Sequence, residues 1–182
     1  MEEPSEGLVR AAAAGDDAAF ASLVRHYEDH VRRFLLHFLG DASLAEDVAQ
    51  DTFVRVYRGL PSFSFRSGLS SWVFQIARNC AIDALRSRQR RDRVVAAVTP
   101  ARLEEGTSRE PVPSASAELE AAIASLSDKL REALLLVEVY GLTYREAGEV
   151  LGTADGTVKS RVHQARRQLD RWMATEEAAR DV

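Results

Sequence analysis

Apolar residues recur at steps of three and four between Phe20 and Phe38, which is the spacing that places them on one face of a helix. Polar and charged residues fill the positions between them. We therefore predict one long amphipathic helix in this part of the chain, ended by Gly40-Asp41. Its apolar positions are Phe20, Leu23, Val24, Tyr27, Val31, Phe34, Leu35 and Phe38.

A second helix is expected directly after the first. Ser43-Leu44-Ala45-Glu46 has the pattern of a capping box, in which the Ser43 hydroxyl and the Glu46 carboxylate each satisfy a backbone N–H at a helix start. Pro61 should end this helix, because proline cannot donate the next backbone hydrogen bond. The residues predicted to point inward are Val48, Phe53, Val56 and Leu60.

A serine-rich loop with two aromatic residues follows from Ser62 to Ser71, and Ser70 or Ser71 is the expected N-cap of a third helix. This helix should run from about Trp72 to Arg91. Its predicted buried face consists of Val73, Ile76, Ala77, Cys80 and Ala84.

The helical pattern breaks down at residues 92–117, where three prolines stand among Ser, Thr, Gly and Glu. That composition is typical of a flexible linker. Helical spacing returns afterwards, and no alternating pattern of β-branched residues indicates a strand. The sequence predicts an all-α protein of two small helical domains joined by this linker. The apolar positions of the second part begin with Leu119, Ile123, Leu126, Leu130, Leu134 and Val137.

A helix-turn-helix is predicted near the C-terminus. A short helix with Tyr144, Ala147 and Leu151 on one side is closed by Gly152, which suits a left-handed C-cap. A tight turn follows, and Asp155 or Thr157 is the expected cap of the next helix. Two helices joined in this way form the motif. The apolar positions of the second helix are Val158, Val162, Ala165 and Leu169.

The opposite face of that last helix carries side chains suited to reading DNA. Lysine can donate to guanine, glutamine can pair with adenine, serine can serve either base, and arginine can hold phosphates. An ordinary charged surface helix is the competing interpretation, and by itself the motif indicates DNA binding and no more. The residues are Lys159, Ser160, His163, Gln164 and Arg167, with Arg161 and Arg166 at the flanks.

The net charge of -4 does not exclude a nucleic-acid partner, because charge is segregated along the chain. Arginines outnumber acidic residues in 66–91, and basic residues outnumber them again in 156–171. Two separate basic stripes favour two sites on one polyanion over two solvated helix faces. The lone Cys80 is expected in the core, and no spacing of Cys and His indicates a metal site, so no metal or cofactor is expected. The acidic N-terminus and the lack of a long apolar run favour a cytoplasmic protein without membrane insertion.

Three motifs together resemble the sigma-70 family of bacterial RNA polymerase sigma factors, in the compact extracytoplasmic-function (ECF) subfamily. Leu142–Gly152 followed by Gly156–Val162 looks like the fourth sigma domain, which binds the minus-35 promoter element. Trp72–Asp83 resembles the second sigma domain where it meets the minus-10 element. Asp47–Phe53 looks like the segment of that domain that grips the polymerase.

The resemblance implies a promoter-recognition subunit that is not an enzyme. Its partners would be promoter DNA, the core RNA polymerase through the β′ coiled coil and the β flap, and an anti-sigma factor. A base of the non-template strand would flip into the loop from Phe65 to Ser71, where edge hydrogen bonds and a ring contact can hold it. A plain connection between two helices is the competing interpretation of this loop. The implied polymerase-binding residues are Asp47, Gln50, Asp51 and Phe53. The implied minus-10 residues are Phe65, Arg66, Ser67, Gly68, Gln75, Asn79, Asp83, Arg86 and Arg90, and the implied minus-35 residues are Lys159, Ser160, Arg161, His163, Gln164, Arg166 and Arg167.

The expected organisation is an acidic N-terminal extension at 1–16, a second sigma domain at 17–91, a linker at 92–117, a fourth sigma domain at 118–173 and an acidic tail at 174–182. The chain departs from the family in having Ala154-Asp155 where proline is frequent in the turn. The sequence of the loop at 63–68 also differs from the family pattern.

Two other classes of protein compete with this interpretation. A free-standing helix-turn-helix regulator would explain the C-terminal motif, but not the motifs at Asp47–Phe53 and Trp72–Asp83. An enzyme would need a catalytic constellation. His26, His30 and His37 have no nucleophile or ligand partner at a useful spacing, and we expect them at the surface or at the edge of the core.

Overall fold

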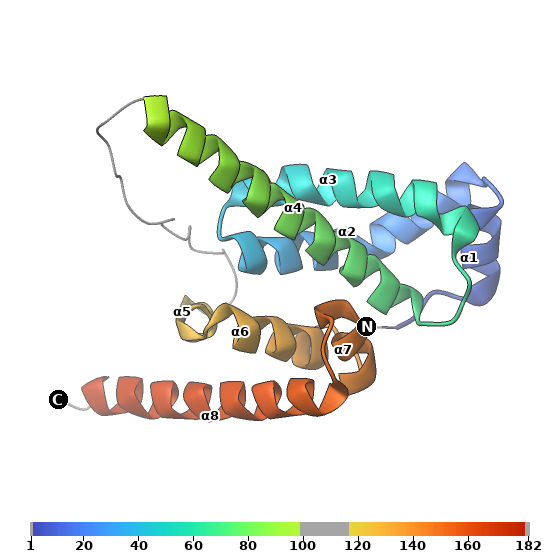
Figure 1. Ribbon diagram of the computed structural model, residues 1–182. Coiled ribbons are helices and arrows are strands. Elements are labelled where there is room, and N and C mark those ends of the chain that lie inside the picture. Colours follow the sequence, from blue (N-terminus) through green and yellow to red (C-terminus); the bar gives the residue numbers. More distant parts are fainter. Residues whose placement is uncertain (1, 99–116, 181–182) are drawn as a thin grey trace. The chain divides into compact units, whose positions relative to one another are not determined.

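The computed structural model describes residues 2–98 and 117–180, and all regular structure within these two ranges is helical (Figure 1). The predicted all-α fold is confirmed. Of the described residues, 4–65 and 73–98 form one compact unit, and 117–180 form a second, with which 2–3 and 66–72 are grouped. None of the described helices is both long enough and apolar enough to cross a membrane.

The N-terminal part consists of four α-helices and one 3₁₀ turn. They are α1 (Glu6–Ala13), α2 (Asp17–Leu39), α3 (Ala42–Gly59), the 3₁₀ turn η1 (Leu60–Ser62) and α4 (Leu69–Val98). Helices α1 and α3 both pack on α2. Helix α4 joins this core through Phe74, whose ring meets that of Phe34 edge to face at a centroid distance of 5.3 Å.

Helix α2 forms as its apolar pattern predicts. Asp16 caps its start by accepting hydrogen bonds from the backbone N–H groups of Ala18 and Ala19. Gly40 ends it in the left-handed conformation at φ 67°, which glycine adopts without steric cost. Most of the predicted apolar face is fully buried, and Phe20, Val24 and Phe38 lie at its half-buried edge. The histidines His26, His30 and His37 are half-buried, as expected for the edge of the core.

The predicted capping box at the start of α3 is wrong. Asp41 is the N-cap and accepts a hydrogen bond from the backbone N–H of Leu44 at 3.0 Å. Ser43 lies inside the first turn. Glu46 does not reach back to a cap, because its carboxylate pairs with Arg32 of α2 at 2.9 Å. Val48, Val56 and Leu60 are buried as predicted, whereas Phe53 is half-buried.

The acidic segment before α2 contains a helix, α1, that was not predicted from the sequence. Ser5 caps α1, and Val9 and Ala12 are buried where α1 packs on α2. These two small apolar residues attach the N-terminal segment to the core.

Helix α4 is longer than predicted at both ends. It starts at Leu69 and not at Trp72, so neither Ser70 nor Ser71 is its N-cap; the Ser71 hydroxyl donates to the Gly68 carbonyl. The helix continues past Arg91 to Val98, so the first residues of the expected linker are helical. The remaining linker residues, 99–116, lie outside the described residues. Of the predicted buried face, Val73, Ala77 and Cys80 are buried and Ile76 and Ala84 are half-buried; Phe74 and Ala81 are also buried.

The second unit contains four α-helices and one π-helical turn. They are α5 (Ala117–Ser125), α6 (Asp128–Leu134), the π turn η2 (Leu135–Val139), α7 (Tyr144–Leu151) and α8 (Asp155–Arg180). Helix α8 packs on both α6 and α7. Ile123, Leu126, Leu130 and Leu134 are buried as predicted, but Leu119 is 53% exposed and Val137 only half-buried.

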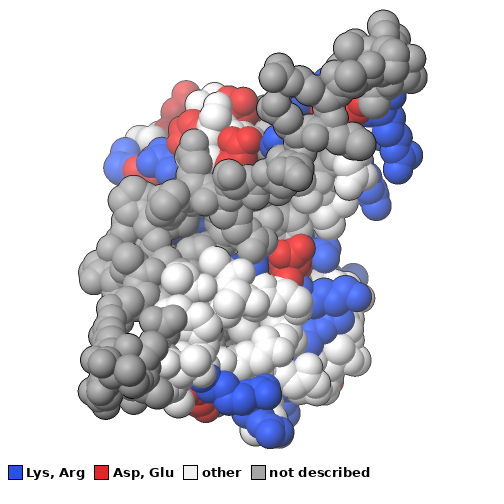
Figure 2. Space-filling view, turned by 90° about the vertical axis from the view of Figure 1, so that its left-hand side faces the viewer, with Lys and Arg blue, Asp and Glu red and all other residues white. Residues whose placement is uncertain are grey.

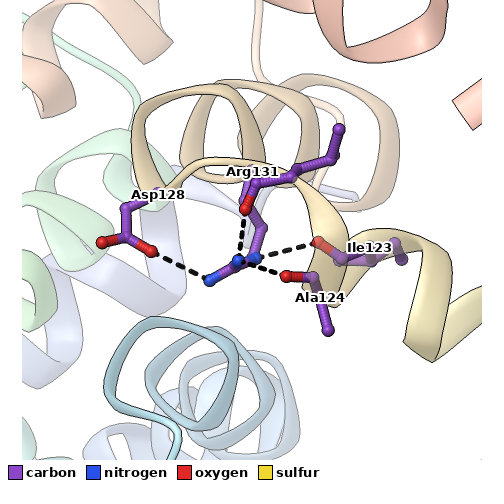
Figure 3. Close-up of polar contacts among 5 residues, drawn as sticks. Ile123, Ala124, Asp128 and Arg131 are labelled. Atoms are coloured by element: carbon purple, nitrogen blue, oxygen red, sulfur yellow. Dashed lines mark hydrogen bonds and ion pairs between the residues drawn. The ribbon is translucent and has the colours of Figure 1, made fainter. Parts of the chain in front are cut away.

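A buried arginine joins α5 to α6. Arg131 of α6 is only 4% exposed, and its guanidinium donates to the carbonyls of Ile123 at 3.0 Å, Ala124 at 2.9 Å and Leu126 (Figure 3). It also pairs with the exposed Asp128 at 3.1 Å. Carbonyl oxygens at a helix C-terminus have no partner within the helix. Arg131 therefore caps α5 from a neighbouring helix.

Candidate nucleic-acid interface

Two local contacts fix the start and the end of the first helix of the helix-turn-helix. The Thr143 hydroxyl accepts from the backbone N–H of Glu146 at 3.2 Å, and the Glu146 carboxylate accepts from the backbone N–H of Thr143 at 2.9 Å. This is a complete capping box. Gly152 ends α7 in the left-handed conformation at φ 63°, which confirms the predicted C-cap.

Close packing of backbone on backbone sets the turn between α7 and α8. The N–H of Thr153 donates to the Gly148 carbonyl at 3.0 Å, and a Cβ atom on Gly148 would stand 2.7 Å from the Thr153 carbonyl oxygen. Only glycine fits there. The prediction of Asp155 or Thr157 as the cap of α8 is wrong, because the Ala154 carbonyl already accepts from the N–H groups of Thr157 and Val158, which places Ala154 before the first turn.

Helix α8 buries one side and exposes the other, as its pattern predicts. Val158, Val162 and Ala165 are at most 1% exposed. Arg161 is half-buried, and Arg166 is exposed but pairs with Glu138 of η2 at 2.6 Å. The remaining predicted residues are all exposed on the outer face: Lys159, Ser160, His163, Gln164 and Arg167.

A second polar stripe lies along α4. Gln75, Asn79 and Asp83 are exposed and four residues apart, so they share one helix face. The Asp83 carboxylate accepts a hydrogen bond from Arg55 of α3 at 3.2 Å, and this hydrogen bond raises the pKa of the Arg55 guanidinium. Asp83 therefore ties α4 to α3.

The basic end of α4 is only partly available to a ligand. Arg86 and Arg90 are exposed, whereas Arg88 donates to the Asp41 carboxylate at 3.1 Å. Since Asp41 is also the N-cap of α3, Arg88 connects two helices. Figure 2 shows one face of the molecule, on which Lys and Arg side chains gather in patches.

The loop before α4 holds an aromatic residue in an unusual backbone conformation. Phe65 has φ 56° and is 37% exposed. Its ring lies 4.9 Å from that of Phe63 between centroids, and the Arg10 guanidinium lies over it at 4.7 Å. Arg66 beside it is exposed, and Ser67 and Gly68 are half-buried.

The predicted polymerase-binding residues lie along α3. Asp47, Gln50 and Asp51 are exposed, whereas Phe53 is half-buried. Val54, 47% exposed, continues the face of Asp47, Gln50 and Asp51, and Tyr57, 48% exposed, follows near its end. Val54 and Tyr57 were not predicted from the sequence as part of this surface, although the spacing from Asp47 to Val54 already indicates a shared face.

Comparisons with known proteins agree with this arrangement. The family model for Sigma-70 region 2 matches residues 23–91, and the model for Sigma-70, region 4 matches residues 116–169. The chain is 34% identical to the ECF RNA polymerase sigma factor SigE of Mycolicibacterium smegmatis, over 94% of this chain and 70% of that protein.

Two solved complexes contain proteins of similar fold. The sigma factor RpoE of Bartonella quintana, bound to the anti-sigma factor NepR, is 28% identical with a TM-score of 0.70, over 85% of this chain and 96% of that one. CnrH, bound to the cytosolic domain of CnrY, is 26% identical with a TM-score of 0.67, over 92% of this chain and 96% of that one. With two family domains in order and a relative aligned over 94% of this chain, the chain belongs to the ECF subfamily of sigma-70 RNA polymerase sigma factors.

Proposed function

We propose that this sigma factor brings core RNA polymerase to promoters through two separate DNA-binding surfaces. The outer face of α8 reads a minus-35 element as duplex. The loop at 63–68 and the exposed stripe of α4 bind the minus-10 element and hold its strands apart. The polymerase supplies the chemistry, and the protein acts in the cytoplasm, where the polymerase works.

The observation that carries the minus-35 assignment is the division of α8 into a buried and an exposed side. Val158 and Val162 hold the helix on its neighbours, while Lys159 and Gln164 project outward from its first turns. A recognition helix enters the major groove with its N-terminal residues leading. Lys159 and Gln164 would then contact bases, and Arg167 would contact phosphate.

The minus-10 assignment is supported by the exposed Gln75 and Asn79 on the helix that follows an aromatic loop. Extruding a base from a duplex costs a few kcal/mol, so a surface that binds the flipped base stabilises the melted state. Asp83 is exposed beside them, and its contact with Arg55 gives it a structural role as well.

Core polymerase and an anti-sigma factor are the proposed protein partners. The mixed polar and apolar face of α3, with Asp47, Gln50, Asp51 and Val54, is suited to a polymerase helix pair such as the β′ coiled coil. The β flap would engage the second unit. The structural relative RpoE, which is bound to the anti-sigma factor NepR, supports an anti-sigma partner for this chain as well.

Run-off transcription on genomic fragments, with core polymerase and with or without this protein, tests the proposal. We expect initiation at discrete sites that requires the protein. The double variant Lys159→Ala/Gln164→Ala should abolish it, because each good side-chain–base pair contributes about 1–3 kcal/mol to discrimination.

The matched control is Lys129→Ala, which removes one positive charge from an exposed position on α6. It should transcribe as the wild type does. Core polymerase that neither binds the protein nor initiates with it would reject the proposal and favour a free-standing DNA-binding regulator.

A further inference from the structure

The N-terminal helix α1 reaches the loop proposed to receive the flipped base. The Arg10 guanidinium stands over the Phe65 ring at 4.7 Å, and Glu6 pairs with Arg10 one turn earlier on the same helix. Helix α1 is itself attached to α2 through Val9 and Ala12. Arg10 and α1 therefore connect the exposed ring of Phe65 to the core of the first unit.

Phe65 needs such support because of its backbone. A φ of 56° lies in the left-handed region, which is unfavourable for residues other than glycine, and it persists only where surrounding contacts hold it. Two contacts with the ring are seen, one from Phe63 in the loop and one from Arg10 outside it. Of these, only Arg10 connects the loop to a helix.

A second contact from the N-terminal segment lies at the other end of the loop. The Glu3 carboxylate accepts from the backbone N–H of Ser70 at 3.0 Å. That N–H is in the first turn of α4, where backbone donors lack helical partners and a carboxylate is favoured by the helix dipole. Glu3 thus helps to cap α4 directly after the loop.

We propose that Arg10 is a positioning residue that holds Phe65 in the conformation that receives the flipped base. This inference rests on the proposed function of the loop. Its physical effect is preorganisation: if only a fraction of molecules carries the loop in the competent conformation, the apparent affinity for the strand falls by that fraction. Arg10 acts through Phe65 and does not itself touch the DNA.

The test uses holoenzyme reconstituted from core polymerase and the full chain. Its binding to a single-stranded oligonucleotide is measured by fluorescence anisotropy. The oligonucleotide carries the non-template strand of the minus-10 element of a promoter mapped by run-off transcription. Arg10→Ala should weaken binding about threefold, and Arg10→Lys should recover part of the loss because an ammonium also favours a ring face. Phe65→Ala should weaken binding at least as much. The double variant Arg10→Ala/Phe65→Ala should match Phe65→Ala alone, since Arg10 acts through the ring.

An oligonucleotide lacking the captured base separates positioning from direct DNA contact. That base is the one whose removal weakens wild-type binding but not Phe65→Ala binding. On the abasic strand Arg10→Ala should bind as the wild type does. A loss that persists there, or in the Phe65→Ala background, would show that Arg10 contacts phosphate and would overturn the inference.

The control variant is Arg25→Ala, which removes an exposed arginine whose guanidinium donates to Ser22 on α2 at 2.9 Å, away from the loop. It should bind the strand normally. The melting temperature of Arg10→Ala and its affinity for core polymerase should equal those of the wild type. Wild-type-like strand binding by Arg10→Ala would reject the positioning role, whereas failure of the wild-type holoenzyme to bind the strand would reject the proposed function itself.

Discussion

The two proposed DNA-binding surfaces are built in different ways. The outer face of α8 belongs to one continuous helix, set by contacts close in sequence: the capping box at Thr143 and the backbone contact between Gly148 and Thr153. The loop around Phe65 is no regular element, and it contacts Arg10, which is more than 50 residues earlier in the sequence. A helix face suits the regular groove of a duplex, while a supported loop suits a single unpaired base.

Removing the buried guanidinium of Arg131 should lower the stability of the second unit, which carries α8, and not that of the first. This is the largest effect on stability that we predict. Arg131→Met keeps the apolar stem but removes the guanidinium that donates to the carbonyls of Ile123, Ala124 and Leu126. Because a hydrogen bond to a charged group contributes about 1.5–3 kcal/mol, and two of these bonds are buried, we expect a loss of about 3 kcal/mol in the free energy of unfolding. Urea unfolding followed by Trp172 fluorescence in a Trp72→Phe background measures it.

Asp128→Ala is the matched control. It removes the ion pair with Arg131 but leaves the carbonyl contacts, and Asp128 is 74% exposed, so the expected loss is under about 1 kcal/mol. Similar losses in Asp128→Ala and Arg131→Met would contradict the assignment of Arg131 as the cap of α5.

Adding one methyl group in the turn of the helix-turn-helix should weaken DNA binding by α8 without affecting DNA binding by the loop around Phe65. In Gly148→Ala the new Cβ meets the Thr153 carbonyl at 2.7 Å, so α7 and α8 must move apart, at a cost of about 1–3 kcal/mol. Binding of holoenzyme to minus-35 duplex should fall, while binding to the minus-10 single strand should not. The same measurement on Gly156→Ala, where a Cβ would meet no atom within 4 Å, should show no such loss.

The sequence predicted the regular surface better than the irregular one, for a physical reason. Periodicity placed Val158, Val162 and Ala165 inside and Lys159 and Gln164 outside, because side chains three or four residues apart in a helix lie on the same face. The cap of α3 was missed because Asp41 and Ser43 are both good cap residues, and the choice between them depends on Arg32 engaging Glu46 from another helix. The contacts of Arg10 and Arg131 depend on tertiary structure, which no local pattern encodes.

The smallest predicted effect concerns Asp83. This exposed carboxylate has two possible roles, to tie α4 to α3 or to contact DNA directly. Its pair with Arg55 joins side chains that are 55% and 49% exposed, so Asp83→Asn should change the free energy of unfolding by less than about 1 kcal/mol. If Asp83 serves chiefly to tie α4 to α3, Arg55→Gln should reduce minus-10 strand binding as much as Asp83→Asn does. A loss confined to Asp83→Asn would show instead that this carboxylate contacts DNA directly.

The central claim is that the two surfaces read separate promoter elements, and base preference measures this most directly. Transcription would be scored from promoter libraries randomised in both mapped elements, using holoenzyme with wild type, Gln164→Ala or Asn79→Ala. We predict that Gln164→Ala relaxes base preference in the minus-35 element alone and Asn79→Ala in the minus-10 element alone. Variants that relax both elements together, or neither, would contradict the assignment of one surface to each element.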